Sequence, residues 1–206
     1  MRFYSVMAET YKGIKFNYKS IGKTISETNL LPELKKWCFI FKKYKLAPVY
    51  SGGSSGNLSF RIKPDENRFM ITASHTALKE NMSDSDFAEV ISYDETNNII
   101  SGKGIRQPSS ESIMHYLIYK NRPDINAVFH GHSTEILKNA KHLNIPVTEK
   151  EFPYGTPETA REVLKLIKNH NFVIIKNHGF ISCGHNFEEA GVKAREILNH
   201  YKSLKQ

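Results

Sequence analysis

The most informative stretch of this chain is Ala127-Val128-Phe129-His130-Gly131-His132-Ser133. Its apolar first half, which follows Asn126, predicts a short buried strand. The residues after it predict a helix that starts at 133–135 and runs to about residue 143. Side chains two residues apart on a strand point to the same face, so the imidazoles of His130 and His132 converge. Imidazole suits zinc and its first-row neighbours, but two ligands do not hold a metal. Further ligands must therefore lie elsewhere in the chain.

His178 is the candidate for the third ligand. It follows residues 172–176, a continuous apolar run that predicts a strand buried on both faces. Three protein ligands with one open position are typical of catalytic zinc. A histidine at a strand end is more often a hydrogen-bonded core residue, so from the residues alone both interpretations stay open. The histidines on predicted helices or in polar loops indicate nothing special: His115, His142, His170, His185 and His200.

Composition limits the class of protein. The chain has 206 residues, 39% of them hydrophobic, which is ordinary for one globular domain. Its net charge of +8 comes from scattered lysines, which indicates a solvated surface and no nucleic-acid partner. No apolar run is long enough to span a membrane, and no secretory signal is recognisable. The two cysteines, Cys38 and Cys183, fit structural thiols of a cytoplasmic protein.

Hydrophobic periodicity predicts alternating helices and strands. Strands are expected near residues 15–21, 57–62, 69–72, 87–91 and 99–100, and helices near 32–46, 109–122, 157–168 and 187–204. Pro32 and Pro157 lie where a helix tolerates proline, in its first turn. Helices before and after nearly every central strand imply layers of helix on a mixed sheet.

Glu111 follows Pro108-Ser109-Ser110, where a helix is expected to begin with Ser109 or Ser110 as its cap. It is either a first-turn acid stabilised by the helix dipole, or an acid or base beside a metal. The serine hydroxyls and the free N–H groups of a helix start form an anion seat, as does the small-residue loop that ends at Gly56-Asn57.

Several segments in fixed order resemble the class II aldolase/adducin family, which includes fuculose-1-phosphate aldolase. The matching segments are Gly53-Ser54-Ser55-Gly56-Asn57-Leu58-Ser59, Ile71-Thr72-Ala73-Ser74, Pro108-Ser109-Ser110-Glu111, Arg122-Pro123-Asp124, residues 127–133 and Asn177-His178-Gly179. They cover roughly residues 33–204.

The resemblance implies an α/β fold, a three-layer α/β/α sandwich around a central mixed, largely antiparallel sheet. It implies a class II aldolase-like domain over residues 31–206, with residues 1–30 as an N-terminal extension. It also implies a cytoplasmic homotetramer with active sites between subunits.

The resemblance also assigns the site. It implies a divalent metal, usually zinc, on His130, His132 and His178, with Glu111 as the carboxylate that touches the metal and acts as acid or base. Residues that match the family's phosphate seat are Ser54, Gly56, Asn57, Ser74, Ser109 and Ser110. The implied reaction is retro-aldol cleavage of a small phosphorylated ketose to dihydroxyacetone phosphate and an aldehyde.

The chain departs from the family pattern at two places. His75 stands where the family's phosphate loop commonly has glycine, and it either binds the anion or crowds the seat. The tyrosine that a neighbouring subunit supplies as general acid has no match after the two histidines, and Tyr154 is the nearest candidate.

Three other functions remain open at this point. A dehydratase of the methylthioribulose-1-phosphate type, or a decarboxylase of a phosphorylated sugar acid, shares the metal histidines. An adducin-like interaction domain typically lacks them. An unrelated zinc hydrolase needs no phosphate seat.

Overall fold

The computed structural model describes residues 13–50, 53–54 and 56–203. The helices are α1 (Leu31–Lys43), α2 (Ser112–Asn121), α3 (Thr134–Lys138), α4 (Pro157–Ile167) and α5 (Phe187–Ser203), with one 3₁₀ turn at Asp84–Asp86. The strands are β1 (Asn17–Gly22), β2 (Val49–Tyr50), β3 (Gly53–Ser54), β4 (Gly56–Arg61), β5 (Phe69–Thr72), β6 (Phe87–Asp94), β7 (Ile99–Lys103), β8 (Ala127–Gly131), β9 (Phe172–Ile175) and β10 (Gly179–Gly184).

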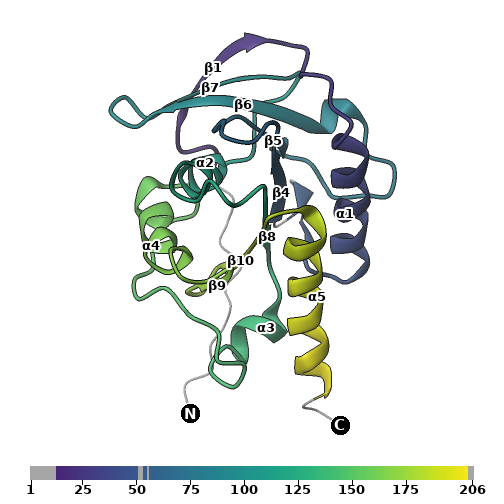
Figure 1. Ribbon diagram of the computed structural model, residues 1–206, viewed down its shortest axis with the longest axis vertical. Helices are drawn as coiled ribbons and strands as arrows, with labels where there is room; N and C mark the ends of the chain where they lie inside the picture. Colours follow the sequence, from purple (N-terminus) through teal and green to yellow (C-terminus); the bar gives the residue numbers. More distant parts are fainter. Residues whose placement is uncertain (1–12, 51–52, 55, 204–206) are drawn as a thin grey trace.

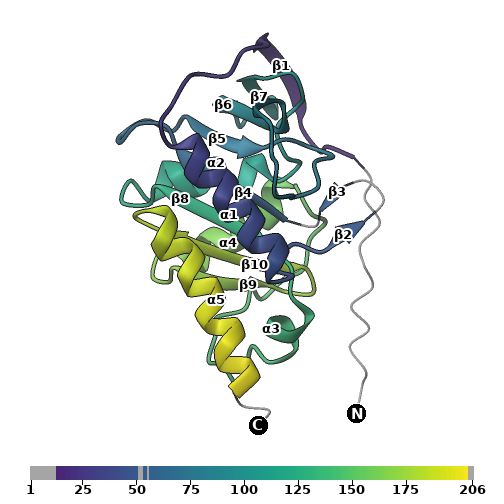
Figure 2. The same ribbon diagram turned by 90° about the vertical axis from the view of Figure 1, so that its right-hand side faces the viewer.

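Eight of these strands form one sheet in the order β1-β7-β6-β5-β4-β8-β10-β9. Every neighbouring pair is antiparallel except β1 and β7, which run parallel. Helices α1 and α5 cover one face of the sheet, and α2 and α4 cover the other (Figures 1 and 2). The predicted three-layer α/β/α sandwich with a mixed, largely antiparallel sheet is therefore confirmed.

Strand alternation divides the core between the two faces. On β8, Phe129 belongs to the cluster under α1 and α5, whereas Val128 belongs to the cluster under α2 and α4. Side chains alternate along a strand, so a continuous apolar run fills both layers at once. Edge strand β9 is buried as well, because residues 146–148 run beside it: Ile174 N donates to the Pro146 carbonyl, and Thr148 N to the Ile174 carbonyl.

Two predicted helix boundaries were wrong. The helix expected over 133–143 ends at Lys138, because Asn139 donates its side-chain amide to the Glu135 carbonyl and so competes with the helical bond. Helix α2 begins at Ser112 with Glu111 in the N-cap position, so neither Ser109 nor Ser110 is its cap. A turn in which Ser112 N donates to the Ser109 carbonyl precedes this helix.

The periodicity analysis missed strand β10 and the short hairpin of β2 and β3. β10 lies between β8 and β9 and pairs antiparallel with both, so it connects the two predicted histidine-bearing strand ends. Among the described residues, no helix is long and apolar enough to cross a membrane.

Candidate metal centre

Three imidazoles meet at one end of the central strands. His130 lies in β8, His132 directly follows that strand, and His178 lies in the turn between β9 and β10. β10 pairs with β8 so that Phe180 stands opposite Gly131, and this register carries the β9–β10 turn to the end of β8. Asn177 allows the turn because asparagine tolerates its left-handed backbone, with φ at +58°.

The ring nitrogens converge closely. His130 Nε2 is 2.9 Å from His132 Nε2 and 3.3 Å from His178 Nε2. A glycine is required beside them: a Cβ on Gly179 would lie 2.6 Å from the Gly131 carbonyl oxygen and 2.7 Å from His130 Cε1. The structure therefore brings together the three histidines that the sequence singled out, as one group able to hold a metal ion.

The tautomer of His130 follows from its second ring nitrogen. Nδ1 lies 2.9 Å from the Phe180 carbonyl oxygen, which can only accept, so Nδ1 carries a proton and Nε2 is the nitrogen left to bind a metal. A hydrogen bond of this kind to a backbone carbonyl orients a metal-binding imidazole and raises its basicity.

Glu111 supplies a carboxylate at the same point. Its Oε2 is 2.8 Å from His130 Nε2 and its Oε1 is 3.2 Å from His178 Nε2. Both carboxylate oxygens are buried, and the two imidazoles are their polar neighbours among the described residues. Burial raises the pKa of Glu111, but His130 and His178 outweigh that effect and hold the pKa well below its usual value.

His132 is held in the neutral form. Burial, followed by the nearby His130 and His178, lowers the pKa of His132 well below its usual value. A neutral imidazole and an ionised carboxylate are the protonation states that bind a metal.

These donors fit a divalent cation. His130 Nε2 and a Glu111 carboxylate oxygen lie 2.8 Å apart, and both are atom types that coordinate zinc. Tetrahedral zinc with bonds of about 2.0–2.1 Å places ligand nitrogens roughly 3.3 Å apart. The observed separations of 2.9 and 3.3 Å lie near that value.

The residues predicted for the phosphate seat lie on neighbouring segments. Gly56 and Asn57 of β4 pair with Gly131 and His130 of β8, and the buried side-chain oxygen of Asn57 accepts no hydrogen bond from described residues. The Ser109 and Ser110 side chains are buried immediately before Glu111. The structure says less about the other two predicted residues, Ser74 and Ser54.

Ser74 is buried, and its N–H donates to the Gln107 carbonyl, two residues before Ser109. Ser54 lies in β3, but its side chain is outside the described part of the structure. His75 is exposed and has a φ of +56°, the left-handed conformation that a glycine at this position adopts without strain.

Tyr154, the low-ranked candidate for a general acid, has a partner within the chain. Its hydroxyl donates to the Gly13 carbonyl at 3.1 Å, and the Lys15 ammonium lies 5.2 Å from its ring centroid. The adjacent Gly155 packs against the Ser110 carbonyl, where a Cβ would approach to 2.6 Å. These contacts connect the N-terminal segment to the loop behind Ser110.

A role for His115 was not predicted from the sequence. It is fully buried on α2, one helical turn after Glu111, and contacts Ser59 and, through it, Tyr119. The signal was present in the helix, because Glu111, His115 and Tyr119 recur every four residues and share one face.

Comparison with known proteins decides the family. The model of the class II aldolase and adducin N-terminal domain matches residues 40–201. The chain belongs to the class II aldolase and adducin family. The resemblance inferred from the motifs is thereby confirmed, and the family implies a lyase that uses a divalent metal.

Relatives within the class II aldolase and adducin family carry different activities. An L-fuculose phosphate aldolase of Methanococcus maripaludis is 34% identical over 173 residues, covering 75% of this chain and 86% of the relative. A 3-oxo-tetronate 4-phosphate decarboxylase of Haemophilus influenzae is 26% identical over 167 residues, covering 72% of this chain and 75% of the relative. A solved L-fuculose 1-phosphate aldolase superposes with a TM-score of 0.70 at 25% identity, covering 86% of this chain and 85% of that chain.

Proposed function

We propose that the protein is a metal-dependent aldolase that cleaves a small phosphorylated ketose into dihydroxyacetone phosphate and an aldehyde. The observation that carries this proposal is the placement of the buried Glu111 carboxylate against His130 and His178, with one oxygen 2.8 Å from His130 Nε2 and the other 3.2 Å from His178 Nε2. The 34% identical fuculose phosphate aldolase supports the same substrate class.

The chain's own groups divide the work. His130, His132, His178 and Glu111 would hold the metal, with zinc as the proposed ion. When bound, the ion supplies Lewis acidity that polarises the substrate carbonyl and offsets negative charge that develops during cleavage. Ionised Glu111 takes the proton from C3 of dihydroxyacetone phosphate in the direction of condensation and returns it to that carbon in cleavage.

The phosphate is proposed to bind beside this centre. Ser109 and Ser110 precede the start of α2, and the positive end of a helix favours an anion. Gly56 and Asn57 approach from β4, where Asn57 is paired with His130. Ser54 and Ser74 remain further candidates for the phosphate contacts, and Tyr154 remains one for the general acid.

The proposal extends to assembly and location. A cytoplasmic homotetramer is what the family resemblance implies. Residues 31–206 are proposed to form the family domain and residues 1–30 an extension of it. Strand β1 of that segment joins the edge of the main sheet, and we propose no nucleic-acid or membrane partner.

A decarboxylase of a phosphorylated sugar acid is the second candidate, because the Haemophilus influenzae relative with that activity matches 72% of this chain. Assays with a panel of sugar phosphates distinguish the candidate activities by the product that each releases. Aldol cleavage releases a triose phosphate, decarboxylation releases carbon dioxide, and a dehydratase releases neither. The four converging donors argue against an adducin-like interaction domain.

The deciding experiment is proton exchange at C3 of dihydroxyacetone phosphate. The zinc-loaded protein is incubated with this ketose phosphate in deuterated water, and deuterium entry is followed by NMR. Wild-type protein should exchange one proton, and Glu111→Gln should slow exchange by at least about 100-fold while its three histidines retain the metal. Glu135→Gln, an exposed acid on α3, is the matched control and should exchange normally. Equal exchange by Glu111→Gln and wild type would contradict the assigned role.

A further inference from the structure

A buried polar seam runs between helix α2 and strand β4. One helical face presents Glu111, His115 and Tyr119, which recur every four residues. The facing strand presents Asn57, Ser59 and Arg61, which alternate with the apolar Leu58 and Phe60 of the opposite cluster. Four helical residues rise about 6.0 Å and two strand residues about 6.7 Å, so the two series keep nearly the same spacing.

Ser59 is the centre of this seam. Its Oγ lies 2.7 Å from His115 Nδ1 and 2.8 Å from the Tyr119 hydroxyl, and all three side chains are at most 1% exposed. The next rung is held by Arg61, whose guanidinium lies 4.8 Å from the Tyr119 ring centroid and donates to the Tyr119 carbonyl at 2.9 Å.

The protons in this cluster can be assigned. Ser59 has one hydroxyl proton, and the choice is between His115 Nδ1 at 2.7 Å and the Val128 carbonyl at 3.3 Å. When the hydroxyl donates along the shorter contact, Ser59 Oγ is left to accept from the Tyr119 hydroxyl; in the other His115 tautomer, Nδ1 donates to Ser59 Oγ and the same contact persists. His115 is neutral, because burial and, secondarily, the neighbouring His130 lower its pKa to about 3.

Apart from these contacts and the hydrogen bonds of Arg61 to the carbonyls of Tyr119 and Arg122 at the C-terminal end of α2, the interface lacks such direction. Its other buried contacts come from apolar side chains such as Ile113, Leu117 and Ile118. Apolar burial is roughly proportional to area and does not specify one axial position, whereas a short hydrogen bond does.

We propose that His115 is a positioning residue for the metal carboxylate. Its hydrogen bond to Ser59 fixes the axial register of α2 on β4, so that Glu111, one turn earlier, faces His130 and His178. The inference rests on the proposed function for its kinetic consequence, but its metal-binding consequence stands independently.

Substitutions at position 115 test whether a polar atom at the position of Nδ1 is what the site requires. Asparagine carries a polar atom close to the position of Nδ1 and retains the contact with Ser59, whereas leucine removes it. His115→Leu should weaken zinc binding at least tenfold in a chelator competition and lower kcat of the zinc-saturated enzyme at least tenfold. KM should stay within threefold, because Pro108 before the serines is held by its bridge to Ala73. His115→Asn should restore zinc affinity and kcat to within threefold of wild type.

Ser59→Ala tests the same bond from the strand, and it covers the case in which His115→Leu fails to fold. Ser182→Ala is its matched control, because Ser182 is equally buried and donates to the Ala190 carbonyl of α5 at 2.6 Å on the opposite face of the sheet. Both variants should melt at lower temperature, but only Ser59→Ala should lose zinc affinity and kcat.

Two results would overturn the proposal. The first is a drop in melting temperature for Ser59→Ala and His115→Leu with zinc affinity and kcat at wild-type values. That result would show that the contact stabilises the fold but does not position Glu111. The second is an equal loss in His115→Asn and His115→Leu. A wild-type protein without turnover on any sugar phosphate refutes the proposed function alone, since the zinc affinities of the same variants still decide the role of His115.

Discussion

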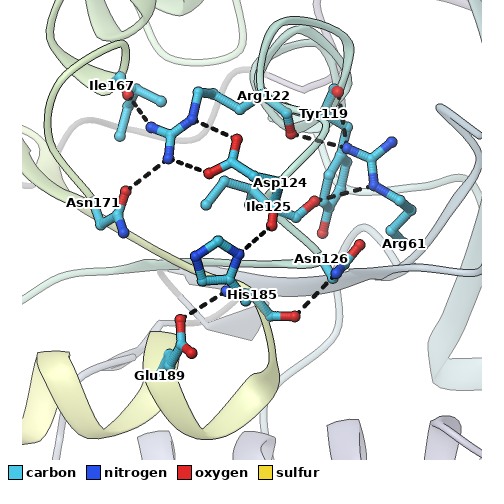
Figure 3. Close-up of polar contacts among 10 residues, drawn as sticks. All are labelled: Arg61, Tyr119, Arg122, Asp124, Ile125, Asn126, Ile167, Asn171, His185 and Glu189. Carbon is cyan, nitrogen blue, oxygen red and sulfur yellow. Dashed lines mark hydrogen bonds and ion pairs between the residues drawn. The ribbon is translucent and has the colours of Figure 1, made fainter. Parts of the chain in front are cut away.

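Arg61→Met should destabilise the protein by about 3–5 kcal/mol, which makes it the sharpest stability test of the fold. The Arg61 guanidinium donates to the carbonyls of Tyr119, Arg122 and Ile125 at 2.9–3.1 Å (Figure 3). It also donates to the Glu66 carbonyl. Arg122 is the C-cap of α2, and carbonyls at a helix C-terminus lack helical partners. Methionine keeps most of the aliphatic stem and removes every donor.

The size of the expected loss in stability depends on which carbonyl acceptors remain inaccessible to water after the substitution. The bonds to Tyr119 and Ile125 are fully buried, whereas water can reach the carbonyls of Arg122 and Glu66 after the substitution. Two buried hydrogen bonds from a charged donor contribute about 1.5–3 kcal/mol each, and the loss of the ring contact adds about 0.5–1 kcal/mol. These contributions sum to about 3.5–7 kcal/mol. Methionine also removes the cost of burying the guanidinium, which lowers the pKa of Arg61, so we expect a net loss of about 3–5 kcal/mol. That loss is a large part of the roughly 5–15 kcal/mol that stabilises a domain.

Equilibrium urea unfolding at fixed zinc concentration measures this loss. The matched control is Arg195→Met, because Arg195 lies at the same 4.8 Å from the Tyr44 ring centroid but, within the described part of the chain, donates only to the Tyr44 hydroxyl. We expect the control to lose about 1 kcal/mol or less. A loss in Arg61→Met below about 1.5 kcal/mol, or no larger than the control, would refute the argument.

Four further outcomes are expected. His178→Ala should purify with little or no bound metal by elemental analysis, and full metal occupancy would remove His178 from the ligand set. Ser110→Ala should raise KM about tenfold for a phosphorylated substrate and leave an unphosphorylated analogue unaffected; an equal rise for both argues against phosphate contact. Tyr154→Phe should keep kcat within about twofold, because the hydroxyl already donates to a backbone carbonyl of the N-terminal segment; a loss of about 100-fold would instead support the general acid. Burial raises the pKa of Glu89, but Arg68 outweighs it and the pKa lies below its usual value, so this carboxylate stabilises the fold above about pH 4.3 and the contribution is lost as pH falls. Glu89→Gln should therefore flatten the acid limb of stability in urea titrations from pH 6 to 3, and an unchanged slope would show that the pair contributes nothing.

Much of the architecture could be predicted from local pattern. Thr156 caps α4 as expected, with Oγ1 accepting from Thr159 N, because a hydroxyl followed by proline is a short-range signal. Strand β10 was missed because Gly179 and Gly184 bound an apolar run broken by Ser182. That hydroxyl is buried where only the packed helix α5 supplies its acceptor.

The candidate site likewise contains residues that local pattern identified and one residue that it did not. His130 and His132 are neighbours on one strand, so the alternation of side chains by itself indicates that they converge. Helical spacing places His115 on the same face as Glu111, but its partner Ser59 is 56 residues away and belongs to another element. A buried polar side chain can be recognised only when its hydrogen-bond partner is known.

The sequence by itself indicated the family, most of the helices and strands, and the three histidines and Glu111 as candidate site residues, because each motif and each periodic segment is a short stretch of the chain. The tertiary structure alone decided how these parts meet. His178 reaches His130 across 48 residues through the pairing of β10 with β8, and Glu111 reaches both through the position of α2 on β4. Strand register and helix position depend on hydrogen bonds and burial between distant segments, which local periodicity does not encode.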